Sequence, residues 1–449
     1  MIKSFSVTNF RSISEKVTID FEKSKRKKGE NDNYSNDKKI ALSTVFYGAN
    51  ASGKSNILKA LAVLKYLIKE SARFQPDSSI NAYMPFRLNK KFLKKPTTFE
   101  IDFYIKDTLY RYMISFNEKE IIEEKLDYFP SRRTANLFTR KKNEIYFGEY
   151  FKGEKKAIQK LLLPNQLFVS KGAENNIEGI IPVFNFFSKD LLIYNLPESL
   201  IEYEIPSFLN FIKLLYPIRD LEDILSKKHI QDKLAEIIAK KYDSSPSRKL
   251  RYLISSLDTG IQDILSKKEE DLLTVLSASN SKLSKLNKLK DLNYHLKTMH
   301  LNNENELVEF DIDDESEGTK NLITIGTLII DALESGKVLI VDEFEENLHP
   351  LISSYLVKLF HQKDLTNKKN AQLIFSTHDA TLMDKHLFNR DQIWLVEKNE
   401  FGSTEVYRCS DIQGLRLEAP LEKWYLSGRL GGTAIINDIN FLLEYQNEK

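Results

Sequence analysis

The chain has 449 residues, of which 41% are hydrophobic and 29% charged, and its formal net charge is only +2. This length exceeds what one compact core usually spans, so more than one domain is expected, and the near-neutral balance confines any basic surface to a local patch. The single cysteine, Cys409, excludes an internal disulfide and a cysteine-cluster metal site and predicts a cytoplasmic protein, and no stretch approaches the ~20 apolar residues of a membrane span.

Two strands are expected at the start of the chain. Polar and apolar residues alternate over residues 2–8 and 16–21, which is typical of half-buried strands. The polar stretch 23–39 has no apolar periodicity and predicts a loop; its basic run 25–28 could contact phosphates, although a solvated loop is the more frequent outcome. The short apolar run 42–47 suits a buried strand.

A phosphate-binding motif follows that strand. The stretch GANASGKS, residues 48–55, satisfies the pattern G-x-x-x-x-G-K-[ST]. Gly48 and Gly53 allow backbone N–H groups to turn inward around phosphates, and Lys54 supplies a cation to the β- and γ-phosphates. The Ser55 hydroxyl can ligate Mg²⁺, and a helix expected to run to about residue 69 adds its N-terminal dipole. The alternative is a glycine-containing turn without a ligand.

A meander and a helical region are expected in the middle of the chain. Residues 98–105, 109–116 and 120–129 alternate and are joined by short turns, which predicts an antiparallel meander. Residues 201–301 are lysine-rich and mostly helical in pattern, which predicts a helical arm or lobe. Its basic faces would either be solvated or contact nucleic acid.

From residue 306 the pattern changes to α/β. The apolar runs VEFDI, KVLIVDE and AQLIFSTHD alternate with helical stretches, which favours a largely parallel sheet. Residues 392–411 indicate a hairpin with its turn near Gly402.

Polar residues follow two of these apolar runs. After a phosphate loop, Asp342 is expected to hold Mg²⁺, partly through water, and Glu343 to act as the general base on the attacking water. His378 stands at the carboxyl end of an expected strand and could donate a hydrogen bond to the γ-phosphate. The alternative for this segment is a capping turn, with Asp379 as the cap.

The segment DDESEGTKNL, residues 313–322, opens another helix. Backbone amides at its start suit an anion, and a plain helix start capped by Ser316 with Thr319 nearby suits the residues equally well.

These elements, in this order, resemble the ABC-class ATPases of the SMC, RecF and OLD group. Six segments are similar to those of the RloA-like AAA-type ATPases, which are relatives of the OLD ATPases of bacterial anti-phage and restriction-associated systems. They are FSVTNFRSI, GANASGKSN, ESEGTKNL, VDEFEENLHP, STHD and LEKWYLSGRLGG. The AbiL and PARIS (AriA) ATPases are also similar. The resemblance covers both ends of the chain well and residues 145–297 loosely. It implies an α/β fold: an ABC-type ATPase head with a mixed, largely parallel sheet, flanking helices and an antiparallel β subdomain, plus a mainly helical insertion.

The resemblance also implies an assembly and its site residues. In such families two heads sandwich ATP and Mg²⁺, and the phosphate loop of one subunit faces the signature segment of the other. By position, Ser316 and Gly318 would contact the partner's γ-phosphate, Arg11 would lie near the phosphates, and residues 347–350 would form the dimer-crossing loop. The implied nucleotide-binding set is Gly48, Asn50, Ser52, Gly53, Lys54, Ser55, Asn56, Arg11, Ser316 and Gly318; the metal set is Ser55 and Asp342; the catalytic set is Glu343 and His378.

Two family features depart from this pattern or have no clear match. The signature SEGTK differs from the transporter pattern and suits the RloA-like branch. The Q-loop glutamine has two candidates, Gln75 and Gln166.

A nuclease centre is not expected in this chain. OLD proteins carry a C-terminal TOPRIM nuclease that needs a glutamate and an Asp-x-Asp pair. Residues 311–313 match Asp-x-Asp by spelling but run straight into the signature segment, so we interpret them as structural. After His378 only 449 − 378 = 71 residues remain, fewer than a nuclease domain usually needs.

The sequence therefore predicts an ATP-hydrolysing protein that forms an ATP-linked homodimer or higher oligomer. It would control a separate effector, a TOPRIM-type nuclease, in anti-phage defence, without a membrane partner. The expected division is an N-terminal part of the head at 1–145, a mainly helical insertion at 146–300, and a C-terminal part of the head at 301–449.

Three rival functions are compatible with a phosphate loop. A GTPase needs an Asn-Lys-x-Asp motif, and the nearest approach, residues 367–370, ends in Asn. A transporter ATPase subunit fits the opening and signature segments less well. The strongest rival is a RecF- or SMC-like DNA-repair or DNA-clamp ATPase, which would bind nucleic acid directly.

Overall fold

The structure is a computed structural model that describes residues 1–24, 31–130, 133–153, 156–196, 244–257, 259–268, 294–416 and 418–434. The chain forms two compact units. The first comprises Met1–Phe184 and Ile374–Lys449, and the second comprises Asn185–Leu373. The first unit is therefore discontinuous in sequence, because the second is inserted into it.

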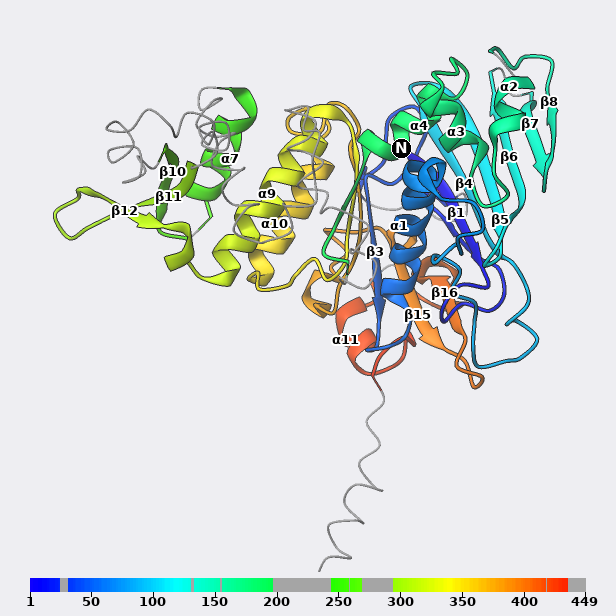
Figure 1. Cartoon of the computed structure of the whole chain (residues 1–449). Helices are drawn as coiled ribbons and strands as arrows, with labels where there is room; N and C mark the ends of the chain where they lie inside the picture. Colours follow the sequence, from blue (N-terminus) through cyan, green and yellow to red (C-terminus); the bar gives the residue numbers. More distant parts are fainter. Residues whose placement is uncertain are drawn as a thin grey trace, which may run out of the picture. The chain divides into compact units, whose positions relative to one another are not determined.

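A seven-stranded antiparallel sheet forms one layer of the first unit (Figure 1). Its strand order is β2-β1-β4-β5-β6-β7-β8. The strands are β1 (Ile2–Thr8), β2 (Val17–Asp20), β4 (Thr97–Ile105), β5 (Thr108–Phe116), β6 (Ile121–Phe129), β7 (Ala135–Lys141) and β8 (Glu144–Phe147). The predicted opening strands and meander are confirmed. The alternation that predicted them is a burial pattern, since Phe99, Ile101 and Phe103 of β4 are almost fully buried.

The strand before the phosphate loop lies in a second sheet. Within the first unit its order is β16-β15-β3-β14, with β3 (Ser43–Gly48), β14 (Gln372–Ser376), β15 (Ile393–Lys398) and β16 (Thr404–Arg408). β3 and β15 are parallel, and β15 and β16 form the predicted hairpin, with Gly402 in its turn at φ +72°. Every residue of β3 is buried, as its short apolar run predicted.

Short helices and one long helix complete the first unit. They are α1 (Lys54–Glu70), η1 (Ser71–Arg73), α2 (Lys156–Leu161), α3 (Phe168–Glu174), η6 (Ala380–Leu382), η7 (Arg390–Gln392), η8 (Cys409–Asp411) and α11 (Leu421–Leu426); α4 (Ile181–Asn185) ends at the junction between the units. α1 is the predicted helix after the phosphate loop, and it lies beside β3 (Figure 1).

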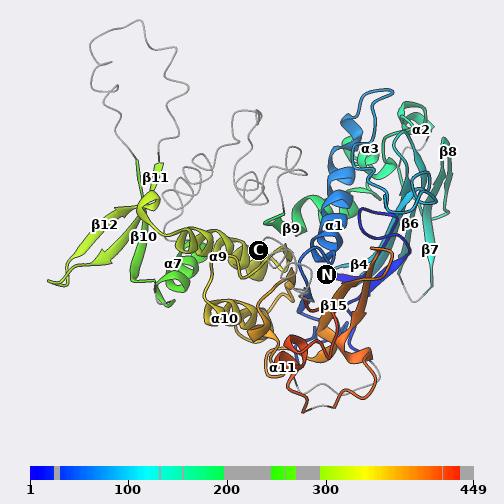
Figure 2. The same ribbon diagram turned by 90° about the horizontal axis from the view of Figure 1, so that it is seen from below.

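The second unit combines a parallel strand pair, helices and a small sheet. Among its described residues, the elements are η2 (Phe186–Asp190), β9 (Leu191–Tyr194), α7 (Ser245–Ser255), β10 (Ile261–Lys268), β11 (Tyr294–Leu301), β12 (Leu307–Asp311), η5 (Ile312–Asp314), α9 (Glu317–Ser335), β13 (Val338–Val341) and α10 (Pro350–His361). β9 and β13 are parallel, and β10, β11 and β12 form an antiparallel sheet in that order. α9 contacts both α7 and α10, as Figure 2 shows.

The expected helical lobe differs from the structure where the structure describes it. α7 is helical, but β10 and β11 are strands within the stretch 201–301 that was expected to be mostly helical. The leucine spacing of KLNKLKDLNYHLK, residues 285–297, predicts a helix. However, the last residues of this stretch belong to β11, because they pair with β10 and β12. Residues 201–243, 258 and 269–293 of the expected lobe lie outside the described residues, as does the basic run 25–28 of the loop predicted at 23–39. The three-part domain division stays a prediction.

The predicted α/β fold class with an antiparallel β subdomain is confirmed by the parallel pairs β3–β15 and β9–β13 together with the seven-stranded sheet. None of the described helices has the length and apolar character that crossing a bilayer requires.

Candidate functional site

The phosphate loop connects the end of β3 to the start of α1. Gly48 ends β3, and Gly53, in a left-handed conformation at φ +113°, is the N-cap of α1. A Cβ at Gly48 would lie 2.4 Å from the carbonyl oxygen of Val396, and one at Gly53 would lie 2.2 Å from Oγ1 of Thr404. Glycine is therefore required at both positions by close packing and, at Gly53, also by its backbone conformation. The predicted strand–loop–helix context of the motif is confirmed.

Two side chains of the loop are buried in a way that fits a phosphate ligand. Lys54 is 5% exposed, and its Nζ donates to the carbonyl oxygens of Gly48 (2.7 Å) and Ala49 (3.2 Å). Ser52 is 3% exposed, and its Oγ has no hydrogen-bond partner among the described residues. Leaving a buried hydroxyl unpaired costs about 1–3 kcal/mol, and a phosphate oxygen would supply the missing partner. Asn50 is exposed.

A chain of hydrogen bonds supports the loop from the β15–β16 hairpin. Oγ1 of Thr404 donates to the carbonyl oxygen of Ser52 (2.8 Å). Because that hydroxyl has one proton, Oγ1 accepts the bond it shares with Oγ of Ser12 (2.8 Å), and Ser12 in turn accepts from Nδ2 of Asn56 (2.6 Å). We call Ser12, Asn56 and Thr404 the loop brace.

Only one member of the loop brace is identified by the sequence pattern. Asn56 was expected to bind the nucleotide, whereas its Nδ2 donates to Ser12 here. Ser12 and Thr404 were missed because they are far from the motif in sequence. Their only sequence signals are the position of Ser12 directly after Arg11 and that of Thr404 just past the hairpin turn.

Arg11 lies next to the loop brace in sequence. Its backbone is left-handed at φ +50°, and its N–H donates to the carbonyl oxygen of Met84 (2.6 Å). Burial, and then the positive charge of Arg87, lower the pKa of the Arg11 guanidinium. The two neighbouring guanidinium groups create a local positive potential. A positive potential would attract phosphates, as the predicted place of Arg11 near phosphates requires.

His378 follows β14. It is exposed, between the fully buried Thr377 and the half-buried Asp379. The N–H of Thr377 donates to the carbonyl oxygen of Phe46 in β3 (3.1 Å), so β14 ends close to the strand that carries the phosphate loop. Oδ1 of Asp379 accepts from the N–H of Thr381 (2.9 Å) and caps η6. The capping turn is therefore present, and the placement of His378 at a strand end is compatible with both interpretations of the segment.

The late segment LEKWYLSGRLGG packs against the start of the phosphate loop. Tyr425 of α11 is 5% exposed and stacks edge-on against Tyr47 with ring centroids 5.4 Å apart. Burial raises the pKa of the Tyr425 phenol, and a hydrogen bond from the backbone of Gly48 acts in the opposite direction. This segment therefore contributes to the surroundings of the loop, a role that its similarity to the RloA-like family did not specify.

The carboxylates expected to act on Mg²⁺ and water follow β13 in the second unit. Asp342 is 2% exposed, and its N–H donates to the carbonyl oxygen of Tyr194 (3.2 Å). Glu343 is exposed and left-handed at φ +51°, between the buried Asp342 and Phe344. A non-glycine residue in that conformation is strained, and such residues cluster at functional sites.

The signature segment and the segment after Glu343 are joined within the second unit. Oγ of Ser316 accepts from the N–H of Thr319 (3.1 Å) and caps α9, so the predicted helix start is confirmed. A Cβ on Gly318 would lie 2.5 Å from the carbonyl oxygen of Asn347. Nδ2 of Asn321 donates to the carbonyl oxygen of Glu346 (2.5 Å). The signature and the expected dimer-crossing loop are therefore in direct contact, and Asn321 was not singled out from the sequence.

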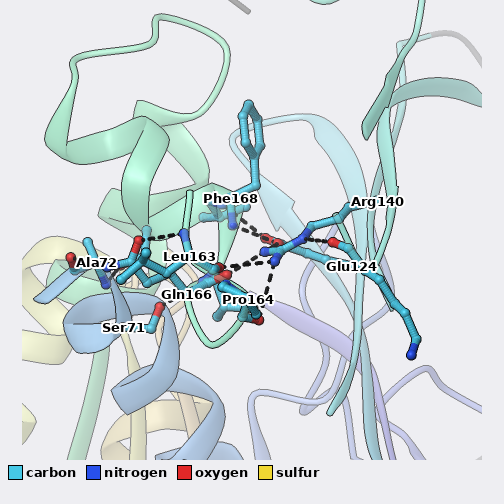
Figure 3. A network of polar contacts seen from close by, with 12 residues as sticks. Ser71, Ala72, Glu124, Arg140, Leu163, Pro164, Gln166 and Phe168 are labelled. Atoms are coloured by element: carbon cyan, nitrogen blue, oxygen red, sulfur yellow. Dashed lines mark hydrogen bonds and ion pairs between the residues drawn. The ribbon is translucent and has the colours of Figure 1, made fainter. Parts of the chain in front are cut away.

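The two Q-loop candidates differ in their surroundings. Gln75 is exposed. Gln166 is 3% exposed; its Nε2 donates to the carbonyl oxygens of Ala72 (2.8 Å) and Phe74 (3.1 Å). Figure 3 shows it beside the buried Arg140, which donates to the carbonyl oxygen of Gln166. This network commits the Gln166 side chain to its neighbours.

That network also contains a buried ion pair. Glu124 and Arg140 are almost fully buried, with their charged groups 3.6 Å apart (Figure 3). Burial raises the pKa of Glu124 although Arg140 lowers it, and the N–H of Phe168 donates to Glu124 (2.6 Å). The pair connects β6 and β7 to the start of α3 and is interpreted as structural.

The two expected Mg²⁺ ligands lie in different units. Mg²⁺ in nucleotide sites keeps several waters and takes one or two protein oxygens plus phosphate oxygens. The Ser55 hydroxyl of the first unit and the Asp342 carboxylate of the second unit are each oxygens of this kind. Within the described ranges no three His, Cys, Asp or Glu side chains gather as an all-protein metal site.

Several solved structures resemble the chain over most of its length. The SMC head bound to the C-winged helix domain of ScpA is 15% identical, covering 91% of this chain and 97% of that chain, with a TM-score of 0.39. The SMC head domain with an extended coiled coil bound to the C-terminal domain of ScpA, derived from Pyrococcus furiosus, is 14% identical (91% and 96% covered, TM-score 0.37). The recombination mediator protein RecF-ATPrS of the RecFOR pathway is 14% identical (90% and 98% covered, TM-score 0.32). At these values the likeness carries no inference about function. A search of curated proteins finds no match.

The sequence also matches the profile of one protein family over most of its length. The family is described as "AAA domain, putative AbiEii toxin, Type IV TA system", and it matches residues 43–384. This span contains the phosphate loop, the signature segment, Asp342, Glu343 and His378. Since the match covers well over half of the 449 residues, the chain belongs to this AAA family.

Proposed function

We propose that this protein is an ABC-type ATPase that binds and hydrolyses ATP, pairs with a second copy around the nucleotide, and controls a separate effector in bacterial anti-phage defence. The observation that carries the ATPase part is the phosphate loop. Its lysine is buried against the loop carbonyls, its Ser52 hydroxyl has no hydrogen-bond partner among the described residues, and both of its glycines are required by close packing.

Each residue of the proposed site has a defined task. Lys54 exchanges the loop carbonyls for the β- and γ-phosphates, and the amides at the start of α1 contribute their dipole. Ser55 and Asp342 would hold Mg²⁺, which would supply positive charge to the phosphates. Glu343 accepts the proton of the attacking water, and His378 donates to the γ-phosphate.

The dimer is the finer part of the proposal. Ser316 and Gly318 act on the nucleotide held by Lys54 of the other subunit. Support comes from the exposure of Ser316 at the start of the 19-residue helix α9, where backbone amides suit an anion. The similarity of the segment ESEGTKNL to the RloA-like ATPases supports the same arrangement.

The effector is proposed to be a TOPRIM-type nuclease on another polypeptide. Support comes from the family description, which names a toxin and a type IV TA system, and from the similarity to the RloA-like, AbiL and PARIS ATPases. A cycle of ATP binding and hydrolysis changes the contacts between two heads, and that difference can bias a bound partner.

Calorimetry with ATP and Mg²⁺ tests the central part of this proposal. Wild-type protein should bind ATP, and Lys54→Ala should bind it far more weakly while keeping the wild-type circular dichroism. Glu343→Gln should bind ATP and hydrolyse it more slowly by about 10²–10⁴-fold, because the amide keeps the shape and loses the base. Equal ATP affinity in Lys54→Ala and wild type would refute the site, and near-normal turnover in Glu343→Gln would place the base elsewhere.

A further inference from the structure

A strongly basic loop lies between η1 and β4 in the first unit. Residues 86–96, FRLNKKFLKKP, hold five cations and no acidic residue, in a chain whose net charge is +2. The five are Arg87, Lys90, Lys91, Lys94 and Lys95, and the first four are exposed. None of the five forms an ion pair with a described residue. Two leucines are also exposed between them, Leu88 at 72% and Leu93 at 42%. We call residues 86–96 the basic loop.

The basic loop is held in one conformation by buried polar contacts. Asn9, which is 0% exposed, donates from Nδ2 to the carbonyl oxygens of Phe92 (3.0 Å) and Lys95 (2.7 Å) and accepts from the N–H of Phe86 (3.0 Å). The hydroxyl of Tyr83 donates to the carbonyl oxygen of Lys95 (2.8 Å). A loop fixed in this way loses little further backbone entropy when a partner binds.

The basic loop adjoins the phosphate-loop brace. The N–H of Arg11 donates to the carbonyl oxygen of Met84. Burial, and to a smaller extent the nearby charge of Arg87, lowers the pKa of Arg11. The next residue, Ser12, contacts Thr404 and Asn56 of the brace. Leu88 also lies against the β15–β16 turn, since a Cβ on Gly402 would be 2.5 Å from its Cδ1. All these contacts are within the first unit.

A segment of opposite charge lies in the second unit. Residues 304–317 hold eight acidic residues and no cation, and the segment includes Ser316 of the signature. β12 within it is exposed along its whole length, including Leu307 (56%), Val308 (39%) and Phe310 (43%). β12 is one of the two outer strands of its sheet as described, and an exposed apolar outer strand is a typical docking surface. We call residues 304–317 the acidic segment.

We propose that the basic loop of one chain docks on the acidic segment of a second copy. The two surfaces carry opposite charge, and each has exposed leucines or other apolar side chains among its charges. A two-fold dimer would form this contact twice, because each subunit offers both surfaces. The proposal rests on the proposed ATP sandwich. In that dimer the phosphate loop of one subunit faces Ser316 in the acidic segment of the other. Since the loop brace adjoins the basic loop, the basic loop of the first subunit would lie near the same acidic segment.

Nucleic acid is the competing occupant of the basic loop. Phosphodiesters would match its cations equally well. The exposed Leu88 and Leu93, and an acidic apolar counterpart on the same chain, favour a second copy.

Charge reversal on full-length protein tests the docking. One variant carries Lys90→Glu and Lys94→Glu; the other carries Asp313→Lys and Asp314→Lys, since both aspartates are exposed. The control, Lys106→Glu with Lys119→Glu, makes the same charge change on other exposed lysines of the first unit. Self-association is measured by analytical ultracentrifugation with and without a non-hydrolysable ATP analogue and Mg²⁺, and labelled duplex DNA binding by fluorescence anisotropy.

The expected results distinguish a contact between two copies from a nucleic-acid surface. Each reversal alone should weaken the dimer by on the order of tenfold or more, and the control should not. Mixing the two reversed proteins should restore dimers. In a mixed dimer one of the two contacts pairs wild-type surfaces, and the other pairs reversed surfaces that again have opposite charge. A wild-type protein that stays monomeric, unchanged dimerisation of the reversed variants, or reversal that removes only DNA binding would each overturn the proposal. ATP binding measured by calorimetry on the same samples tests the proposed function separately.

Discussion

At the residue scale, some residues around the phosphate loop can be recognised from a sequence motif, and others only from their contacts in the folded chain. Gly48, Gly53 and Lys54 belong to a local pattern, because neighbouring residues must surround the same phosphates. Thr404 reaches Ser52 from a hairpin 352 residues away in sequence. No local pattern can indicate such a contact, because it exists only once β15 and β16 pair beside β3.

The loop brace gives a residue-scale prediction. Thr404→Val keeps the side-chain shape and removes the hydroxyl, so the Ser52 carbonyl loses its donor, at a cost of about 1–3 kcal/mol. We expect ATP affinity to fall by roughly tenfold, which corresponds to about 1.4 kcal/mol, and calorimetry measures it. Thr404→Ser keeps the hydroxyl and should bind ATP like wild type. If Thr404→Val binds ATP as wild type does, the brace has no influence on the loop.

At the element scale, periodicity predicted the strands of the first unit well and the small sheet of the second unit poorly. The strands β4, β5 and β6 alternate because one face of each packs in the core. β11 likewise buries Leu296 and Thr298 two residues apart, together with Met299. Its surroundings in sequence also carry leucines three or four residues apart, and cross-strand pairing overrides that helical signal.

The end of α10 gives an element-scale prediction about pH. His361 is half-buried as a residue, and burial of its ring, followed by the charge of Lys358, lowers its pKa to about 3 from 6.5. The unfolded chain therefore binds a proton below pH 6.5 that the folded chain does not bind until about pH 3, so stability falls as pH falls through that window.

His361→Gln removes this titration. Compared with the variant, the wild type should lose about 1.4 kcal/mol of unfolding free energy between pH 7.5 and 5.5, because one proton is taken up by the unfolded state alone. Urea unfolding of both proteins at the two pH values measures the difference. An equal change with pH in both proteins would show that the His361 pKa is not lowered on folding.

At the scale of the whole molecule, the proposed sharing of each ATP site between two subunits predicts complementation between variants. Gly318 is a poor position for this test, because a side chain there would collide with the carbonyl of Asn347 in the same subunit. Ser316→Asp is better, since aspartate also caps helices and would, in the proposed dimer, add a negative charge facing the partner's γ-phosphate. Ser316→Asn is the neutral capping control.

Lys54→Ala and Ser316→Asp proteins should each hydrolyse ATP very slowly. A mixture should recover activity, because a mixed dimer has one site with both intact residues. A phosphate-release assay at varied mixing ratios measures the recovery, which should peak near equal amounts. Full activity of Ser316→Asp alone would show that Ser316 does not act on the nucleotide.

The proposed role in defence predicts a division of labour between two polypeptides. Asp311 is paired with Lys297, a contact that is compatible with a structural role. The proposal predicts that the purified chain hydrolyses ATP but leaves DNA intact with Mg²⁺ or Mn²⁺. Co-expressed with its neighbouring gene it should form a stable complex, detected by pull-down and mass spectrometry. Glu343→Gln should change the toxicity of that pair, because it holds the heads in the ATP-bound state. Metal-dependent DNA cleavage by the chain alone, lost on substituting Asp311 and Asp313, would instead make it a self-contained nuclease.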